Sequence, residues 1–433
     1  MKIVVQGLWH LGCVTAACCA QHHEVLGLDF DEPTVKGLQQ GKAPLFEPGL
    51  NELIANGLGR KSLRFLSDAN EACSGADILW LCYDTPVNED DESDTGFVLT
   101  QLGKSLAHLA DQSLVLVSSQ LPVGTCRSLE RDYPQLHFAY SPENLRLGKA
   151  IDSFTRAERV IVGLRDTSKQ ELIKRLFEPF SSQIIFMRTE SAEMVKHALN
   201  SFLALSITFI NEIARLCERT GADAKEVAAG LKSEPRIGPR AYLGPGGPFA
   251  GGTLARDVVT LTELAGENKE QVPLISAIKK SNDEHRHWNF ERLLLRMGDL
   301  RNRTIAILGL TYKPGTDTLR RSAAVELCSQ LIKAGARVRA MDPAVKSLPP
   351  DVSNVVLLST VMEAVKGADA VVVCTEWPEF RQVDWAAAAT AMSGRLVLDA
   401  NRFLDKELKQ LSTLEHVSVG VPRSSAGNGA GVR

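Results

Sequence analysis

The stretch KIVVQGLWHLG, residues 2–12, opens the chain and is the strongest single indication of its fold. Its apolar run predicts a buried strand, the residues up to His23 have helical spacing, and EVLGLDFD (residues 24–31) predicts a second strand. A strand, a helix and another strand in about thirty residues are typical of a parallel sheet in an α/β fold. Further short apolar runs occur at residues 76–82, 113–120, 137–142, 159–164 and 183–189. We therefore predict a doubly wound, Rossmann-like domain over residues 1–190.

The apolar spacing changes after residue 190. Apolar residues recur three and four positions apart over residues 192–221 and 273–297, which predicts long helices, one of them running from about Arg256 to Met297. We expect residues 191–300 to form a helical middle domain with a long central helix, through which chains associate as a homodimer or a larger homo-oligomer. TIAILGLTYKPGTD (residues 304–317) opens a second Rossmann-like domain over residues 301–433, and SSAGNGAGVR (residues 424–433) is expected to be disordered.

The composition of the chain limits the kinds of molecule that we expect it to bind. With 23% charged residues and a formal net charge of −3, the chain has no basic excess that would favour nucleic acid or an anionic membrane. The nine cysteines form no CxxC pair, so we expect reduced thiols in the cytoplasm and no zinc site. The apolar N-terminus is interrupted by polar residues and glycines, which argues against a signal peptide, and no other apolar run approaches a membrane span. The expected partners are small molecules and other protein chains.

The turn between the first predicted strand and helix has most of a dinucleotide-binding fingerprint. Gly7 and Gly12 occupy the first and third glycine positions, while Trp9 stands at the second. Asp29 ends the next predicted strand, where a carboxylate binds a ribose hydroxyl and favours NAD over NADP. These residues predict NAD binding. The alternative is a Rossmann-like domain whose nucleotide site has been lost.

A series of motifs along the chain carries a family resemblance. They are FEPGL (46–50), DTPVNEDDESD (84–94), SSQLPVGT (118–125), SPENLRLGKAI (141–151), EMVKHALNSFLALSITFINE (193–212), RIGPRAYLGPGGPFAGGT (236–253), ILGLTYKPGTDTLRRS (307–322), MDP (341–343), TEWPEF (375–380) and DANR (399–402). In their order and spacing the chain resembles the UDP-glucose/GDP-mannose dehydrogenase family from end to end. The resemblance implies NAD-dependent oxidation of the C6 hydroxymethyl group of a nucleotide sugar, through an aldehyde to a carboxylate.

The same resemblance implies roles for particular residues. Lys196 and Asn200 match residues that stabilise an oxyanion, Asp257 matches an aspartate that orients water and the lysine, and Glu143 matches an acid/base. The implied cofactor-binding residues are Gly7, Trp9, His10, Leu11, Gly12, Asp29, Thr85, Pro86, Ser119, Gln120 and Arg320. The implied substrate-binding residues are Glu143, Asn144, Leu145, Lys196, Asn200, Arg236, Tyr242, Leu243, Gly246, Gly251, Lys313 and Arg402, with backbone N–H groups of the glycine-rich loop binding the diphosphate.

The chain departs from the family pattern at the nucleophile. Thr253 stands where the family has a cysteine, and a threonine hydroxyl is far less nucleophilic than a thiol. Leu147 replaces a glutamate and Asn144 an aromatic residue in the same neighbourhood. The sequence therefore predicts a noncovalent or truncated oxidation of a nucleotide sugar, with uridine favoured over guanosine by overall resemblance. The alternative is a non-catalytic homologue that binds a nucleotide sugar.

Overall fold

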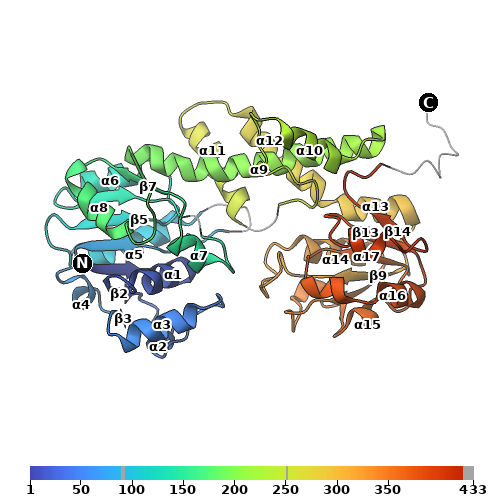
Figure 1. Cartoon of the computed structure of the whole chain (residues 1–433), viewed down its shortest axis with the longest axis horizontal. Helices are drawn as coiled ribbons and strands as arrows, with labels where there is room; N and C mark the ends of the chain where they lie inside the picture. The colour runs from blue at the N-terminus through green and yellow to red at the C-terminus, as the bar shows by residue number, and fades with distance from the viewer. Residues whose placement is uncertain (89–92, 144, 250–251, 423–433) are drawn as a thin grey trace. The chain divides into compact units, whose positions relative to one another are not determined.

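The chain forms two compact units. The computed structural model describes residues 1–88, 93–143, 145–249 and 252–422, so the tail expected to be disordered lies outside the described residues. Contacts between Cα atoms divide the chain into an N-terminal unit, residues 1–199, and a C-terminal unit, residues 200–433. Each unit contains a sheet with helices on both faces (Figure 1).

The N-terminal unit is built on an eight-stranded sheet with the order β3-β2-β1-β4-β5-β6-β7-β8. Its strands are β1 (Lys2–Gln6), β2 (Glu24–Leu28), β3 (Leu63–Leu66), β4 (Ile78–Leu81), β5 (Leu114–Val117), β6 (His137–Tyr140), β7 (Val160–Leu164) and β8 (Ile184–Met187). All neighbours are parallel except β6 and β7. The antiparallel pairing of β6 and β7 departs from the expected parallel pattern. One short helix joins these two strands and does not carry the chain back to the end of the sheet where β6 begins, so β7 runs in the opposite direction.

Helices cover both faces of this sheet. They are α1 (His10–Cys19), α2 (Glu32–Gln39), α3 (Leu50–Gly59), α4 (Ala69–Cys73), α5 (Thr95–Leu106), α6 (Thr125–Asp132), α7 (Ala150–Thr155) and α8 (Gln170–Phe177), with a 3₁₀ turn at Thr167–Lys169. Ile3 and Val5 pack in the core cluster that contains α1, whereas Val4 packs in the cluster that contains α5 residues. Burial on both faces explains why the strands are continuous apolar runs.

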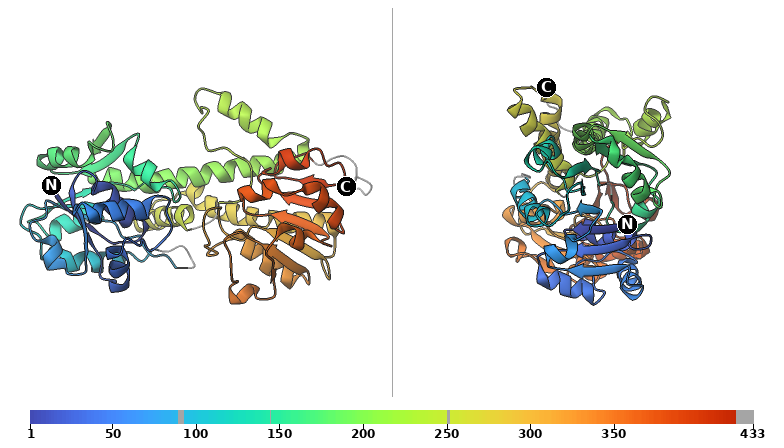
Figure 2. Two further views of the ribbon diagram at one scale, coloured as in Figure 1. Left: turned by 60° about the horizontal axis from the view of Figure 1, so that its bottom comes forward. Right: turned by 90° about the vertical axis from the view of Figure 1, so that its left-hand side faces the viewer.

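A helical segment follows the first sheet. Helix α9 (Thr189–Thr220) is 32 residues long and runs without a break (Figure 2). It is followed by α10 (Ala224–Ser233), α11 (Thr253–Glu267), α12 (Pro273–Arg286) and α13 (Trp288–Met297). The single helix expected from Arg256 to Met297 is therefore wrong, and the long central helix is α9. No helix in the described ranges is long and apolar enough to cross a membrane.

The C-terminal unit contains a second, six-stranded sheet with the order β11-β10-β9-β12-β13-β14, parallel throughout. Its strands are β9 (Thr304–Leu308), β10 (Arg337–Met341), β11 (Val356–Leu357), β12 (Ala370–Val373), β13 (Leu396–Asp399) and β14 (Glu415–Val417). Its helices are α14 (Ala323–Lys333), α15 (Val361–Val365), α16 (Trp385–Ala391) and α17 (Asp405–Leu408), with 3₁₀ turns at Pro350–Val352 and Pro378–Gln382. Two Rossmann-like domains and a helical middle region confirm the predicted fold class.

Candidate functional site

The turn between β1 and α1 requires glycine at two of its three fingerprint positions. Gly7 has φ of +96°, and a Cβ atom there would lie 2.7 Å from Tyr83. A Cβ atom at Gly12 would lie 1.6 Å from the carbonyl oxygen of Gly7. The N–H of Leu8 donates to Oδ2 of Asp29 over 2.6 Å, which fixes this turn beside the end of β2. The geometry is that of a dinucleotide-binding turn.

The second fingerprint position accepts Trp9 without strain. Trp9 is the N-cap residue of α1 with φ of −93°, a value that any residue adopts. Its side chain is 52% exposed, so the indole does not fill the interior of the turn. The first turn of α1 contains no acidic residue, which leaves the positive end of the helix suited to a phosphate group.

His10 has a structural partner that the sequence reasoning missed. Its Nε2 lies 2.9 Å from Oε2 of Glu47, the buried acid of the FEPGL motif. Glu47 also accepts hydrogen bonds from the N–H groups of Gly148, over 2.7 Å, and Ala150, over 2.9 Å. This one carboxylate joins three segments around the start of α1. The lone acid between Phe46 and Pro48 was the available signal.

The other predicted cofactor residues of the N-terminal unit lie mainly at the carboxyl edge of the sheet. Thr85 follows β4 and donates from Oγ1 to the carbonyl of Gln120 over 2.7 Å. Ser119 follows β5 and is fully buried, and its hydroxyl has no hydrogen-bond partner within the ranges that the structure describes. Leu11 is buried on α1, and Pro86 is exposed in the loop after β4. Arg320, also predicted to bind cofactor, belongs to the C-terminal unit.

Lys196 and Glu143 form a contact in the N-terminal unit. Lys196 on α9 is 6% exposed, and its Nζ donates to the backbone carbonyl of Glu143 and, over 3.3 Å, to Oε2 of the same residue. Oε1 of Glu143 accepts from the N–H of Leu145 over 2.5 Å. The amine is therefore held in place, and the carboxylate is fixed on both oxygens. Asn144, between these two loop residues, lies outside the described residues.

A second buried pair lies at the start of the C-terminal unit. Nδ2 of Asn200, one turn after Lys196 on α9, donates to Oδ2 of Asp257 over 2.5 Å. Asp257 is fully buried on α11. Thr253 is the first residue of that helix, four positions before Asp257, and it is exposed. The first turn of α11 contains no acidic residue, so Thr253 stands at a helix end that favours negative charge.

Side chains of the C-terminal unit anchor the glycine-rich loop and accept hydrogen bonds from three of its N–H groups. Gly246 donates to Oδ1 of Asn211 over 3.0 Å, and Gly247 donates to Oδ1 of Asn401 over 2.6 Å. Nε2 of His285 donates to the carbonyl of Gly246 over 2.7 Å. Asn282 bonds both backbone groups of Phe249. Asparagine side chains therefore accept from the N–H groups of Gly246, Gly247 and Phe249 in this conformation, and the binding of a diphosphate by the loop stays a prediction.

The remaining predicted substrate residues have varied surroundings. Arg236 is exposed and lies 2.8 Å from Oε1 of Glu234, and Tyr242 is exposed whereas Leu243 is buried. Nζ of Lys313 lies 5.5 Å from the ring centre of Tyr312. The side chain of Arg402 is 8% exposed and pairs with Asp223 over 2.9 Å. Gly251 lies outside the described residues.

The second Rossmann-like sheet repeats the turn of the first but fills it differently. Oδ2 of Asp342, at the position of Asp29, accepts from the N–H of Leu310 over 2.7 Å and from Nε1 of Trp377 over 3.0 Å. Asp342 is buried, so the protein itself uses this carboxylate. A cavity of about 130 Å³ lies nearby, and its lining includes Gly247, His285, Thr311, Tyr312 and Asn401.

Comparison with known proteins gives this arrangement a family. The UDP-glucose/GDP-mannose dehydrogenase NAD binding domain matches residues 1–181, the family's central domain matches residues 190–284, and its UDP binding domain matches residues 306–406. The chain is 32% identical to a UDP-glucose 6-dehydrogenase of Rhizobium meliloti (strain 1021), covering 98% of this chain and 100% of the relative. It is 32% identical to the UDP-glucose 6-dehydrogenase of Pseudomonas aeruginosa, covering 98% of each. Its structure resembles a UDP-glucose dehydrogenase from Pyrobaculum islandicum, with a TM-score of 0.87, 27% identity and 98% coverage of each chain. The chain belongs to the UDP-glucose/GDP-mannose dehydrogenase family, whose NAD-dependent oxidoreductases act on nucleotide sugars.

Proposed function

We propose that the protein oxidises the C6 hydroxymethyl group of a UDP-hexose with NAD and forms no covalent bond to the sugar. Family membership supports the cofactor and the class of substrate. The observation that carries the noncovalent part is Thr253 at the start of α11, where this chain has no thiol. The rest of the proposal follows from the residues around that position.

The residues of the first turn fit NAD. A Cβ atom would fill the cradle at Gly7 and Gly12, the end of α1 is free of acids, and Asp29 is half-buried at the end of β2. These groups would hold the pyrophosphate and a ribose hydroxyl. When bound, NAD supplies the acceptor for the hydride that leaves C6.

No cysteine elsewhere replaces the missing nucleophile. Burial raises the pKa of all nine thiols, and eight of the nine residues are buried. Cys374 is partly exposed, and burial of its thiol raises that pKa as well. A thiolate is the reactive form, so these groups are inert near neutral pH. The protein therefore has no activated thiol to form a thiohemiacetal.

Lys196 and Asn200 supply donors for the oxygen on C6. They lie one turn apart on α9, and buried donors act most strongly on charge that develops during a reaction. An asparagine amide has two N–H donors, and Asp257 accepts only one of them. We assign Asp257 the role of orienting that amide. Glu143 accepts the hydroxyl proton, directly or through one water molecule.

The reaction balances without an enzyme adduct. The alcohol loses one hydride and one proton and becomes an aldehyde. If the aldehyde is hydrated and a second NAD replaces the NADH, the hydrate loses a hydride to that NAD and two protons to give the carboxylate; if it is not hydrated, the reaction ends after the first step. The Thr253 hydroxyl and the N-terminus of α11 can hydrogen-bond the hydrate or the aldehyde oxygen, but in this proposal Thr253 never attacks C6.

The nucleotide part is assigned to the C-terminal unit. The cavity near the anchored glycine-rich loop is lined by backbone and side chains of both the loop and the second sheet. Lys313 follows β9 and carries a positive charge suited to a diphosphate, while Tyr242 is exposed on the glycine-rich loop. We propose that these residues bind the UDP moiety. Arg402, paired with Asp223, shapes the same unit by fixing the segment after β13.

A direct test mixes the purified protein with NAD and a panel of UDP-sugars and follows NADH absorbance. We expect NADH to form with at least one UDP-hexose and not with the matching UDP-pentose, which lacks C6. Binding of UDP-sugars by calorimetry without NADH formation from any of them would instead support the non-catalytic homologue. The matched control is Asp29→Asn, which retains size but loses the charge that binds the ribose hydroxyl, and it should weaken NAD binding without affecting UDP-sugar binding.

A further inference from the structure

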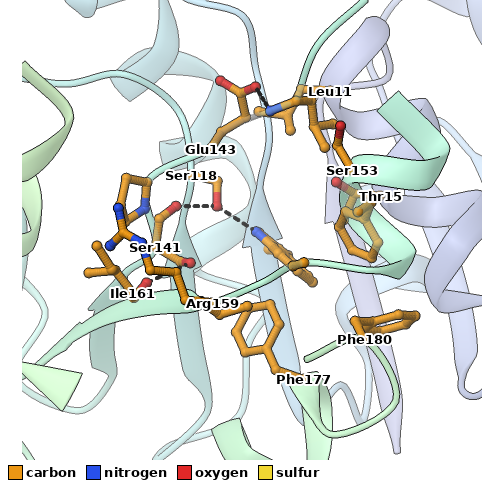
Figure 3. Close-up of a pocket in the computed structure, with 16 residues that line it drawn as sticks. Leu11, Thr15, Ser118, Ser141, Glu143, Ser153, Arg159, Ile161, Phe177 and Phe180 are labelled. Carbon is orange, nitrogen blue, oxygen red and sulfur yellow. Dashed lines mark hydrogen bonds between the residues drawn. The ribbon is translucent and has the colours of Figure 1, made fainter. Parts of the chain in front are cut away.

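A cavity inside the N-terminal unit is lined mostly by residues that the proposed reaction does not use. Its volume is about 80 Å³, and its walls come from α1, α7, the ends of β4, β5 and β6, β7 and the end of α8 (Figure 3). It therefore lies in the layer between the sheet and the helices on the α1 side. Glu143 and Leu145 form one edge of the lining, while the rest consists of residues that the mechanism does not use.

Four aromatic side chains form the apolar wall of this cavity. The ring centres of Trp80 and Phe177 lie 5.4 Å apart at 83°, and those of Phe154 and Phe180 lie 4.9 Å apart at 65°. Trp80 and Phe154 are 6.1 Å apart. These edge-to-face pairs leave ring faces and edges directed at the cavity, a surface that suits another compact ring. Nε1 of Trp80 is already satisfied by Oγ of Ser118 over 2.9 Å.

One end of the cavity holds a buried hydroxyl group with a poor partner. Thr15 on α1 is fully buried, and its Oγ1 has no oxygen or nitrogen partner in the described part of the chain. The thiol of Cys82, a weak hydrogen-bonding group, is a polar neighbour of this hydroxyl. Figure 3 shows Ser153 at the same end of the cavity. A buried hydroxyl group without a strong hydrogen-bond partner is expected to bond to a ligand or a water molecule in the cavity.

The lining includes one arginine that has no partner among the described residues. Arg159 is an exposed member of the lining, and it forms no hydrogen bond or ion pair with any residue that the structure describes. Figure 3 shows it across the cavity from Thr15 and Ser153. A guanidinium group binds carboxylates through two parallel hydrogen bonds. The lining of the cavity thus combines four aromatic side chains with one guanidinium group.

We infer that this cavity binds a small carboxylic acid with a single compact ring. The volume is about half of the roughly 150 Å³ that encloses benzene completely. A ring would therefore be enclosed on part of its surface, between Trp80 and the three phenylalanines, and its carboxylate would lie beside Arg159. The inference concerns binding alone and does not depend on the dehydrogenase reaction.

The test is calorimetry on the full chain, without NAD or nucleotide sugar, using benzoate and its neutral analogue benzamide. We expect benzoate to bind about tenfold more tightly than benzamide, the worth of one charge-assisted hydrogen bond. Arg159→Gln should remove this difference and leave benzamide binding unchanged. Ala157→Leu, at a half-buried position of the lining, should abolish binding of both compounds by filling the space that the ring needs.

Three results would overturn the inference. They are no binding of benzoate to the natural chain, equal affinity for benzoate and benzamide, and benzoate binding that survives both substitutions. Thermal melting shows whether each variant is folded. Arg159 is exposed and without partners in the described ranges, so Arg159→Gln carries the test even where Ala157→Leu disturbs the fold.

Discussion

The proposed reaction gives Lys196 and Thr253 different roles. Lys196 is buried and Thr253 is exposed; in the proposed reaction Lys196 supplies a preorganised charge for the oxyanion, and Thr253 forms no bond to the sugar. Lys196→Ala should lower the rate of the first hydride transfer by roughly a hundred- to a thousandfold, because loss of one oxyanion donor typically costs about 2.7–4 kcal/mol. Thr253→Ala should retain most of that rate. Single-turnover measurement of NADH formation separates the two, and equal losses would contradict the assignment.

We propose that Trp9 contacts the cofactor at the first turn. Its indole is exposed at the N-cap of α1, and we expect it to stack on a ring of bound NAD instead of blocking the site. We expect NAD to quench Trp9 fluorescence, and Trp9→Ala to weaken NAD binding about tenfold, within the range of one aromatic stacking contact. Trp9→Phe is the matched control, which should lose the quenching and retain most of the affinity. Tighter NAD binding by Trp9→Gly would show that the indole obstructs the site.

The glycine-rich loop and α12 form an element whose stability depends on pH. Burial lowers the pKa of His285 to about 4, while its Nε2–H donates to Gly246. The unfolded chain, with a pKa near 6.5, binds this proton more readily, so stability falls as pH drops from about 6.5 to about 4. The full effect is roughly 3 kcal/mol for this group. His285→Gln keeps a donor for Gly246 and should flatten the pH dependence of the melting temperature in this range; an unchanged slope would exclude His285 as its source.

Element boundaries mark the limit of what local sequence predicts. The buried strands were predictable because strands covered on both faces are continuous apolar runs. The break between α11 and α12 was missed, although Pro273 stands in the first turn of α12 and Lys269 adopts φ of +58° just after α11. The anchors of the glycine-rich loop lay beyond sequence reasoning, because Asn211 and His285 are 35 and 39 residues away from Gly246 along the chain.

Helix α9 carries a row of exposed apolar side chains. Phe202, Phe209 and Leu216 are seven residues apart and are 67%, 46% and 59% exposed. A stripe of this kind on a long helix marks a surface for another chain. We expect the protein to be a homodimer or larger homo-oligomer, and Phe202→Glu with Phe209→Glu to give monomers by light scattering. Val356→Glu, at an equally exposed apolar position on β11, is the control and should not change the mass. A monomeric natural chain at micromolar concentration would contradict this expectation.

At the scale of the whole molecule, the order of motifs predicted the family, and the apolar runs predicted the two Rossmann-like sheets, because most of the motifs follow strand ends that local sequence makes visible. The pairing of Lys196 with Glu143 and of Asn200 with Asp257 joins residues 53 and 57 positions apart. Such contacts depend on packing that no local pattern encodes. The motifs predicted which residues are candidates for the site, and the structure showed which residues they contact.

The measurement that tests the central claim most directly is the count of NADH released per UDP-hexose consumed, together with mass spectrometry of the protein chain during turnover. For the natural chain we predict one NADH in the rapid phase and no sugar attached to the protein. Thr253→Cys, which restores a thiol at the start of α11, should release two NADH per sugar and accumulate a thioester adduct at residue 253. An ester-linked sugar on Thr253 of the natural chain would contradict the noncovalent account.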